Sequence, residues 1–204
     1  MGWYADRVLP RIMNKACDDK NLEPYRARTC AGLKGDVVEI GFGSGLNVQF
    51  YPADVTKVAA VEPSERAWRL ADKRLRSVSV PVHWSGLDGQ ALPFPDESYD
   101  AALSTMTLCT IPDLEAALAE VRRVLKPGGA LHFMEHGIAP DEKVRRWQYR
   151  LDPLEKRFVG GCHLTRPIDT LLRNAGFTIT ELDRFYGKGA PKVAAAMYLG
   201  VARI

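Results

Sequence analysis

The stretch Val37-Val-Glu-Ile-Gly-Phe-Gly-Ser-Gly-Leu-Asn47 decides the fold. An apolar run leads into glycines at alternate positions, which is typical of a buried strand that turns sharply into a helix start. Such glycines let the backbone pass close to a ligand, and the amides of the following turn face it. In the dinucleotide fingerprint G-x-G-x-x-G the third glycine would fall at Leu46. The spacing therefore disfavours a pyrophosphate cradle, and with it an NAD-dependent oxidoreductase.

Outward from this loop, short β-rich runs alternate with helical patterns. Helices are expected over residues 67–75 and 114–125, the second ending at Pro127-Gly-Gly129. This alternation predicts an α/β fold of the doubly wound, Rossmann-like type, with a mostly parallel sheet and helices on both faces. The strands are expected at residues 37–40, 58–61, 78–84, 99–104 and 130–135.

Both ends of the chain depart from this alternation. Strands expected at 178–184 and 193–202 are separated by too few residues for a parallel crossover, so they should form an antiparallel hairpin. Two helices, over residues 3–17 and 23–31, are expected ahead of the sheet. Farther along, Thr165 is expected to cap the helix that carries Leu171 and Leu172.

Length and composition limit the class of protein. The 204 residues suit a single domain, and 46% hydrophobic with 26% charged residues excludes disorder. A net charge of +3 does not indicate nucleic acid as a partner. The four cysteines include no Cys-x-x-Cys pair, so neither a disulfide scaffold nor a metal site is predicted. No signal peptide or membrane span is recognisable, which predicts a cytoplasmic protein without stable membrane insertion.

Ligands of open α/β sheets bind beyond the carboxyl ends of the strands. Glu62 follows the second strand and is placed to accept both hydroxyls of a ribose. Asp88, after the third strand, suits an adenine amino group. Ribose, adenine and a glycine-lined tail site without a phosphate site favour S-adenosylmethionine as the cofactor. The predicted cofactor-binding residues are Glu39, Gly41, Gly43, Gly45, Asn47, Glu62, Pro63, Asp88, Gly89, Gln90, Thr105 and Met106.

Motifs spread over about half of the chain resemble those of the class I S-adenosylmethionine-dependent methyltransferases. The resemblance implies an enzyme that transfers a methyl group, and a terminal antiparallel hairpin is that family's own departure from the Rossmann pattern. Gln90 differs from many relatives, which carry Glu there. The matching segments are Glu39-Ile-Gly-Phe-Gly-Ser-Gly45, Glu62, Asp88-Gly-Gln-Ala-Leu-Pro-Phe94, Ser98-Tyr-Asp100 and Leu125-Lys-Pro-Gly-Gly129.

A narrower resemblance covers the second half of the chain, which is similar to the methyltransferase-like thiol S-methyltransferases and their bacterial relatives. It implies a small-molecule acceptor with a thiol sulfur. Those animal enzymes carry an N-terminal membrane anchor, but we do not extend that membrane location to this chain. The segments are Thr107-Leu-Cys109, Phe133-Met-Glu-His136, Trp147-Gln148, Leu151-Asp-Pro153, Gly161-Cys-His-Leu-Thr-Arg166 and Tyr198-Leu-Gly200.

Other functions stay open at this point. Methylation of a quinol or phenol and methylation of a lipid amine are the competing reactions, and a S-adenosylmethionine-binding sensor or partner protein is the non-enzyme alternative. Methylation of nucleic-acid bases is disfavoured, because residues 104–107 lack an Asn/Asp-Pro-Pro-aromatic turn. The sequence leaves the oligomeric state undecided.

Two histidines are the candidate catalytic residues. His136 follows the fifth strand, and His163 lies in a glycine-rich segment that could fold over the cleft. A histidine with its ordinary pKa could take a proton from a thiol or hydroxyl acceptor, although both rings could instead orient loops. The predicted substrate-binding residues are Tyr4, Tyr25, Cys109 and Trp147. The chain is thus expected to be one domain: a helical lid (1–35), a cofactor-binding half (36–136) and an acceptor side with the hairpin (137–204).

Overall fold

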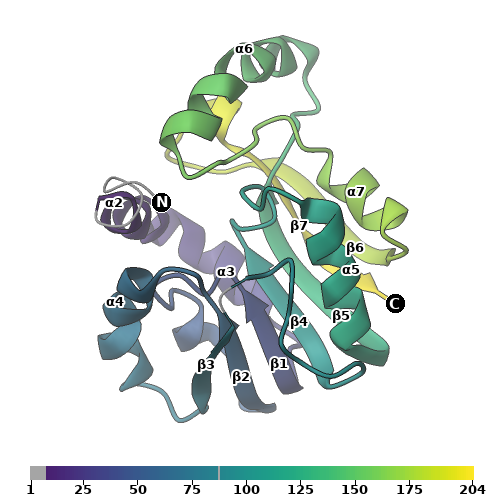
Figure 1. Cartoon of the computed structure of the whole chain (residues 1–204). Helices are drawn as coiled ribbons and strands as arrows, with labels where there is room; N and C mark the ends of the chain where they lie inside the picture. Colours follow the sequence, from purple (N-terminus) through teal and green to yellow (C-terminus); the bar gives the residue numbers. More distant parts are fainter. Residues whose placement is uncertain (1–7, 87) are drawn as a thin grey trace.

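The computed structural model describes residues 8–86 and 88–204. They form a seven-stranded sheet with the strand order β3-β2-β1-β4-β5-β7-β6 (Figure 1). The first five strands pair in parallel, and β7 lies antiparallel between β5 and β6. The predicted α/β class and terminal hairpin are confirmed. The strands are β1 (Gly35–Ile40), β2 (Val55–Val61), β3 (Val82–Gly86), β4 (Tyr99–Thr105), β5 (Leu125–His136), β6 (Thr178–Tyr186) and β7 (Ala196–Arg203).

Helices cover both faces of the sheet because side chains alternate along each strand. In β1, Val38 belongs to the core that includes Leu118 and Leu172, whereas Val37 packs with Cys30. One face is therefore covered by α5 and α7, and the other by α3 and α4 (Figure 1). The helices are α2 (Leu9–Cys17), α3 (Glu23–Cys30), α4 (Glu65–Leu75), α5 (Leu114–Val124), α6 (Glu142–Phe158) and α7 (Ile168–Asn174), with short turns η1 (Lys20–Leu22), η2 (Val48–Phe50) and η3 (Lys192–Ala194).

Several predicted boundaries were wrong. Strand β3 begins at Val82, not at residue 78, because Pro81 just before it has no N–H to donate to a ladder. Strand β7 begins at Ala196, since residues 192–194 form the turn η3. Helix α5 ends at Val124, before Pro127 is reached. Residues 3–7 of the first predicted helix lie outside the described residues.

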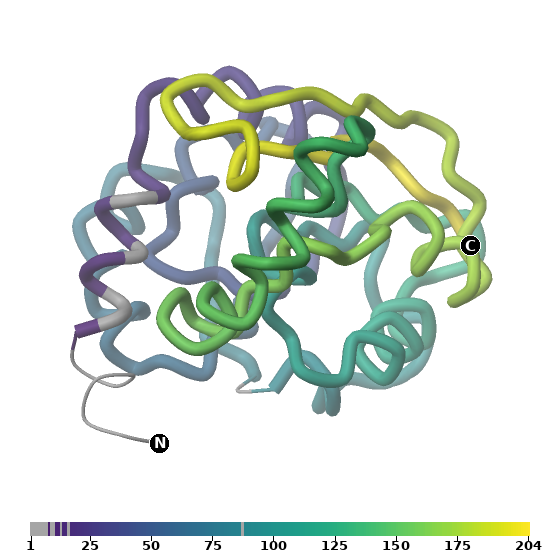
Figure 2. Tube along the Cα trace, turned by 90° about the horizontal axis from the view of Figure 1, so that it is seen from above, coloured from purple at the N-terminus to yellow at the C-terminus, as the bar shows by residue number. Residues whose placement is uncertain are grey.

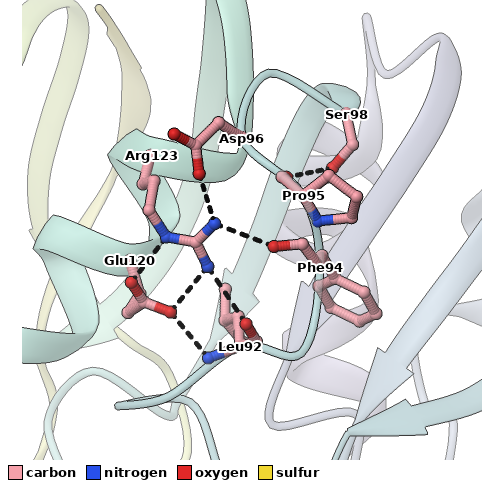
Figure 3. Close-up of polar contacts among 7 residues, drawn as sticks. All are labelled: Leu92, Phe94, Pro95, Asp96, Ser98, Glu120 and Arg123. Carbon is pink, nitrogen blue, oxygen red and sulfur yellow. Dashed lines mark hydrogen bonds and ion pairs between the residues drawn. The ribbon is translucent and has the colours of Figure 1, made fainter.

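The segment between β3 and β4 is fastened to α5 by Arg123 (Figure 3). Its guanidinium donates to the carbonyl oxygens of Leu92 and Phe94 at 3.0 and 2.8 Å and to Asp96 Oδ1 at 2.7 Å. It also pairs with Glu120, which accepts the Leu92 N–H at 2.8 Å. One helical side chain thus fixes the segment that carries the predicted adenine-binding residues.

Helix α6 projects beyond one end of the sheet and, seen from above, crosses the middle of the molecule (Figures 1 and 2). Buried Gln148 ties it down by donating to the carbonyl oxygens of Gly137 and Val193 and accepting the N–H of Ala139. Because α6 follows directly after β5, it lies at the edge where the parallel strands end. Among the described residues, no helix is both long and apolar enough to cross a membrane.

Candidate active site

The glycine loop after β1 adopts the backbone conformation that glycine permits. Gly41, Gly43 and Gly45 have φ angles of 72°, 59° and 73°. A Cβ on Gly41 would lie 2.0 Å from Thr107 Oγ1, so the loop after β4 packs directly against it. At Gly43, by contrast, the nearest described neighbour of a Cβ would be the Gly41 oxygen at 3.9 Å. The loop therefore leaves room for a ligand above Gly43.

Glu62 lies at the carboxyl end of β2 and faces this loop. The residue is 7% exposed, and its carboxylate accepts the N–H groups of Gly43 and Ser64 at 2.8 and 2.7 Å. Burial raises the pKa of Glu62, although these two donors oppose the shift. A carboxylate has about four acceptor positions, so the two oxygens retain capacity for ribose hydroxyls. The free acceptor positions of Glu62 and the open space at Gly43 fit S-adenosylmethionine. Exposed Pro63 follows Glu62 in the sequence.

The loop after β3 is shaped by an Asx turn. Exposed Asp88 accepts from the backbone N–H of Gln90 at 2.8 Å and from its Nε2 at 3.2 Å. The Gln90 side-chain oxygen accepts the N–H of Asp113, where α5 begins. A Cβ on Gly89 would meet the Ile40 side chain at 3.0 Å, so the loop packs closely against β1 here. Gln90 thus braces the loop, a role that the sequence pattern did not reveal.

Three predicted cofactor residues lie in one buried network beneath the glycine loop. Glu39 is 1% exposed and accepts from Asn47 Nδ2 at 2.7 Å and from the Tyr51 hydroxyl. Arg26 donates to Asn47 Oδ1 at 2.8 Å and to Thr105 Oγ1 at 3.1 Å. Burial raises the pKa of Glu39 to about 7. Sequence reasoning missed Arg26 and Tyr51, which carry no motif, although they connect the loop to α3 and β4.

Met106 and Tyr25 share one apolar cluster at the end of β4. Met106 has a φ of 58° and donates its N–H to the Met134 oxygen at 2.8 Å. Tyr25 packs on the same cluster and stacks on Phe185 with ring centroids 4.4 Å apart. The structure thus brings a predicted cofactor residue and a predicted substrate residue together. Tyr4 lies outside the described residues.

Trp147 lies apart from these groups. It is 56% exposed on α6, with the Arg150 guanidinium 5.2 Å from its ring centroid. Together with Pro191 and Lys192 it lines an apolar cavity of about 320 Å³. The described residues that line this cavity come from α6 and residues 191–193, so the structure does not bring Trp147 to the cofactor edge.

Cys109, His136 and Cys162 meet at the ends of β4 and β5. The Cys162 sulfur lies 3.7 Å from His136 Nδ1, and all three possible ligand atoms lie within 4.8 Å of one another. The cysteines are 1% and 4% exposed, and His136 is half-buried. A hydrogen bond from the Cys109 thiol, with help from His136, lowers the pKa of Cys162, and the same bond raises the pKa of Cys109. Sequence reasoning singled out His136 and Cys109 but treated Cys162 as a packing residue.

Backbone contacts hold this cluster in place. Fully buried Glu135 accepts the Ser104 hydroxyl at 2.7 Å and the Cys109 N–H at 3.2 Å. Arg166 donates to the carbonyl oxygens of Leu108 and Ile111 on either side of Cys109. Burial raises the pKa of Glu135. Neither Glu135 nor Arg166 was predicted as a site residue, because their roles depend on contacts between distant segments.

His163 also borders the cluster, through its backbone. Its N–H donates to the Cys109 oxygen at 2.8 Å. Burial, together with Arg166 and Lys156, lowers the pKa of His163 to about 4. A ring that holds its proton so weakly is a poor general base near neutral pH. Of the two predicted catalytic histidines, the structure places the side chain of His136 among other reactive groups.

The sheet order, the glycine loop and the carboxylate at the end of β2 define a Rossmann-like, S-adenosylmethionine-dependent methyltransferase. A family model described as a methyltransferase domain matches residues 38–133. A methyltransferase of Bacillus halodurans, itself described as putative, has the same fold, with a TM-score of 0.73 at 19% identity over 89% of this chain and 98% of that one.

Curated relatives place the chain more narrowly. Thiol S-methyltransferase TMT1B of Rattus norvegicus is 33% identical over 187 residues, which are 88% of this chain and 76% of the relative. Thiol S-methyltransferase TMT1A of Homo sapiens is 32% identical, over 84% of this chain and 72% of the relative. The chain belongs to the methyltransferase family that includes these enzymes.

Proposed function

We propose that this methyltransferase transfers a methyl group to the thiol sulfur of a small molecule. The relationship to the thiol S-methyltransferases over most of the chain carries the proposal. The apolar cluster of Tyr25, Met106 and Met134 supports it, because thioethers and aromatic rings provide a soft, polarisable wall that suits a sulfur acceptor.

Three parts of the cofactor edge would hold S-adenosylmethionine, which would supply a methyl group made electrophilic by its sulfonium. Glu62 would accept hydrogen bonds from the ribose hydroxyls, and the open backbone at Gly43 would admit the amino-acid tail. Asp88 would accept a hydrogen bond from the adenine amino group. The remaining predicted residues support these parts. Gly41 and Gly45 shape the glycine loop, and Glu39, Asn47 and Thr105 join it to β4. Pro63 follows Glu62, Gln90 holds the loop of Asp88, and Met106 lies in the apolar cluster.

The acceptor side must position a sulfur and exclude water. In-line displacement requires the attacking atom about 3–3.5 Å from the methyl carbon, aligned with the bond that breaks. A thiol reacts as its thiolate, and its ordinary pKa of about 8.5 means that modest assistance is sufficient. We assign the apolar wall to Tyr25 and Met106, and the assistance to the end of β5, where His136 lies.

The test is methyl transfer from labelled S-adenosylmethionine to a panel of acceptors. The panel contains small thiols including hydrogen sulfide, a phenol, a quinol and a lipid amine, with products identified by mass. We expect a methyl thioether that forms with saturable kinetics. Transfer to the phenol or quinol but to no thiol would contradict the proposal. Binding of S-adenosylhomocysteine without transfer to any acceptor would instead favour a sensor or partner protein.

A further inference from the structure

Three side chains with metal-binding atoms converge from separate parts of the chain. Cys109 lies in the loop after β4, His136 ends β5, and Cys162 lies between α6 and α7. Their sulfur and nitrogen atoms lie within 4.8 Å of one another. We propose that Cys109, His136 and Cys162 bind a zinc ion, although the sequence spacing predicted no metal site.

The distances suit a tetrahedral ion. Zinc binds thiolate sulfur at about 2.3 Å and imidazole nitrogen at about 2.0 Å, which places two such ligand atoms about 3.5 Å apart. The Cys162 sulfur and His136 Nδ1 are 3.7 Å apart. Two sulfurs and one imidazole also match zinc in chemical type, whereas magnesium and calcium prefer oxygen ligands. Two thiolates balance the charge of the ion in this buried place.

The ligands are held before any ion binds. The His163 N–H donates to the Cys109 oxygen at 2.8 Å and so joins the two cysteine segments. Glu135 in β5 accepts the Cys109 N–H, and Arg166 holds the carbonyl groups on both sides of Cys109. A binding site whose ligands are already positioned spends less binding energy on ordering them.

Three protein ligands leave one tetrahedral position for another group, as in catalytic zinc sites. The acceptor thiol binds at this position, an assignment that rests on the proposed function. The thiol binds as its thiolate and releases its proton to solvent. A sulfur lone pair then forms the bond to the methyl carbon as the carbon–sulfonium bond breaks, which yields a methyl thioether and S-adenosylhomocysteine. Zinc keeps its charge throughout.

The site is tested by metal binding. The full chain, incubated with zinc under reducing conditions and freed of excess ion, should hold one zinc per chain by elemental mass spectrometry. Cobalt in its place should give sulfur-to-cobalt charge transfer and the visible bands of a tetrahedral site. Cys109→Ser, Cys162→Ser and His136→Gln should each weaken zinc binding by at least about 100-fold.

Matched controls keep this test decisive. Cys30→Ala, at a buried cysteine in another core cluster, and His83→Gln, at an exposed histidine of β3, should bind zinc like the wild type. Binding of S-adenosylhomocysteine reports that each variant is folded. A wild-type chain that holds much less than one zinc, or a folded Cys162→Ser variant with unchanged zinc affinity, would overturn the site.

The role of the ion is tested separately. Zinc loading should raise kcat/KM for a thiol at least about tenfold, and adding that thiol to the cobalt-loaded chain should shift the charge-transfer band. Full thiol methylation by the metal-free chain would overturn the activating role and leave the proposed function standing. A zinc-loaded chain that binds S-adenosylhomocysteine but methylates no thiol would overturn the proposed function and leave the metal site standing.

Discussion

A single carboxylate, that of Glu62, connects the end of β2 to the glycine loop and is assigned to the cofactor ribose. Replacing it with alanine should weaken S-adenosylhomocysteine binding by about 3 kcal/mol, roughly 100-fold, because two hydrogen bonds to a charged acceptor are lost. Calorimetric titration measures the affinity. Glu65→Ala, at an exposed residue of α4 that pairs with Arg69, is the matched control and should bind normally. Unchanged affinity in Glu62→Ala would refute the ribose assignment.

The buried carboxyl group of Glu39 makes stability depend on pH. Its pKa is raised from 4.5 to about 7 in the folded chain, so the folded state holds this proton more tightly than the unfolded state does. The resulting stabilisation is complete below pH 4.5 and is lost as the pH rises through 7. Relative to Glu39→Gln, the wild type should lose about 3 kcal/mol of unfolding free energy across this range.

Denaturant unfolding of both proteins at several pH values measures this difference. Glutamine keeps a side-chain oxygen and an amide near Tyr51 and Asn47 but does not titrate, so the comparison isolates one group. If the unfolding free energies of the two proteins change in the same way between pH 4.5 and 7, Glu39 has the same pKa in the folded and unfolded states, and the prediction is wrong.

Among individual residues, sequence reasoning found those at the strand ends and missed their hydrogen-bond partners. Glu39, Asn47 and Thr105 were predicted because the end of a parallel strand is a defined place in the fold. Arg26 was not, since which face of α3 turns inward depends on packing against β1 and β4. The prediction that Thr165 caps a helix was wrong for a similar reason. It does not cap α7, because its hydroxyl and N–H both donate to Asp152 in α6.

Among the elements, α5 determines the position of the adenine loop through Arg123 (Figure 3). Arg123→Ala should lower the unfolding free energy by about 2 kcal/mol, because Leu92, Phe94 and Asp96 lose a shared donor. Faster amide hydrogen exchange across residues 88–98 and a severalfold weaker affinity for S-adenosylhomocysteine should accompany the loss. The control is Arg122→Ala, at the exposed neighbouring arginine. Exchange rates equal to those of the wild type would contradict this role.

Helix α6 shows why some elements escape prediction. Pro153 lies inside it, where proline removes a backbone donor and normally marks a helix end. The charges from Lys143 to Arg157 are mixed in sign and indicate only an exposed surface. The helix persists because Gln148 and Asp152 turn inward and make specific contacts with other segments. Those contacts belong to tertiary structure and cannot be inferred from residue spacing along the chain.

Across the whole molecule, the sheet could be predicted and the reactive cluster could not. Strand–helix alternation predicts a parallel sheet, and the short connection before the last strand predicts the final hairpin. Cys109, His136 and Cys162 lie far apart in sequence, so no spacing rule for metal ligands detects them. They meet because β4 and β5 are neighbours and the segment after α6 returns to their ends.

The antiparallel strand β7 has a consequence for how the chain is made. It is the last strand in the sequence, yet it lies between β5 and β6. Strand β5 ends at His136 and β7 begins only at Ala196, so β5 is made well before the strand that covers its edge. Until β7 joins the sheet, β5 exposes an unpaired edge, which is a site where strands of other chains can add. We expect the nascent chain to need protection at this edge until β7 has joined the sheet.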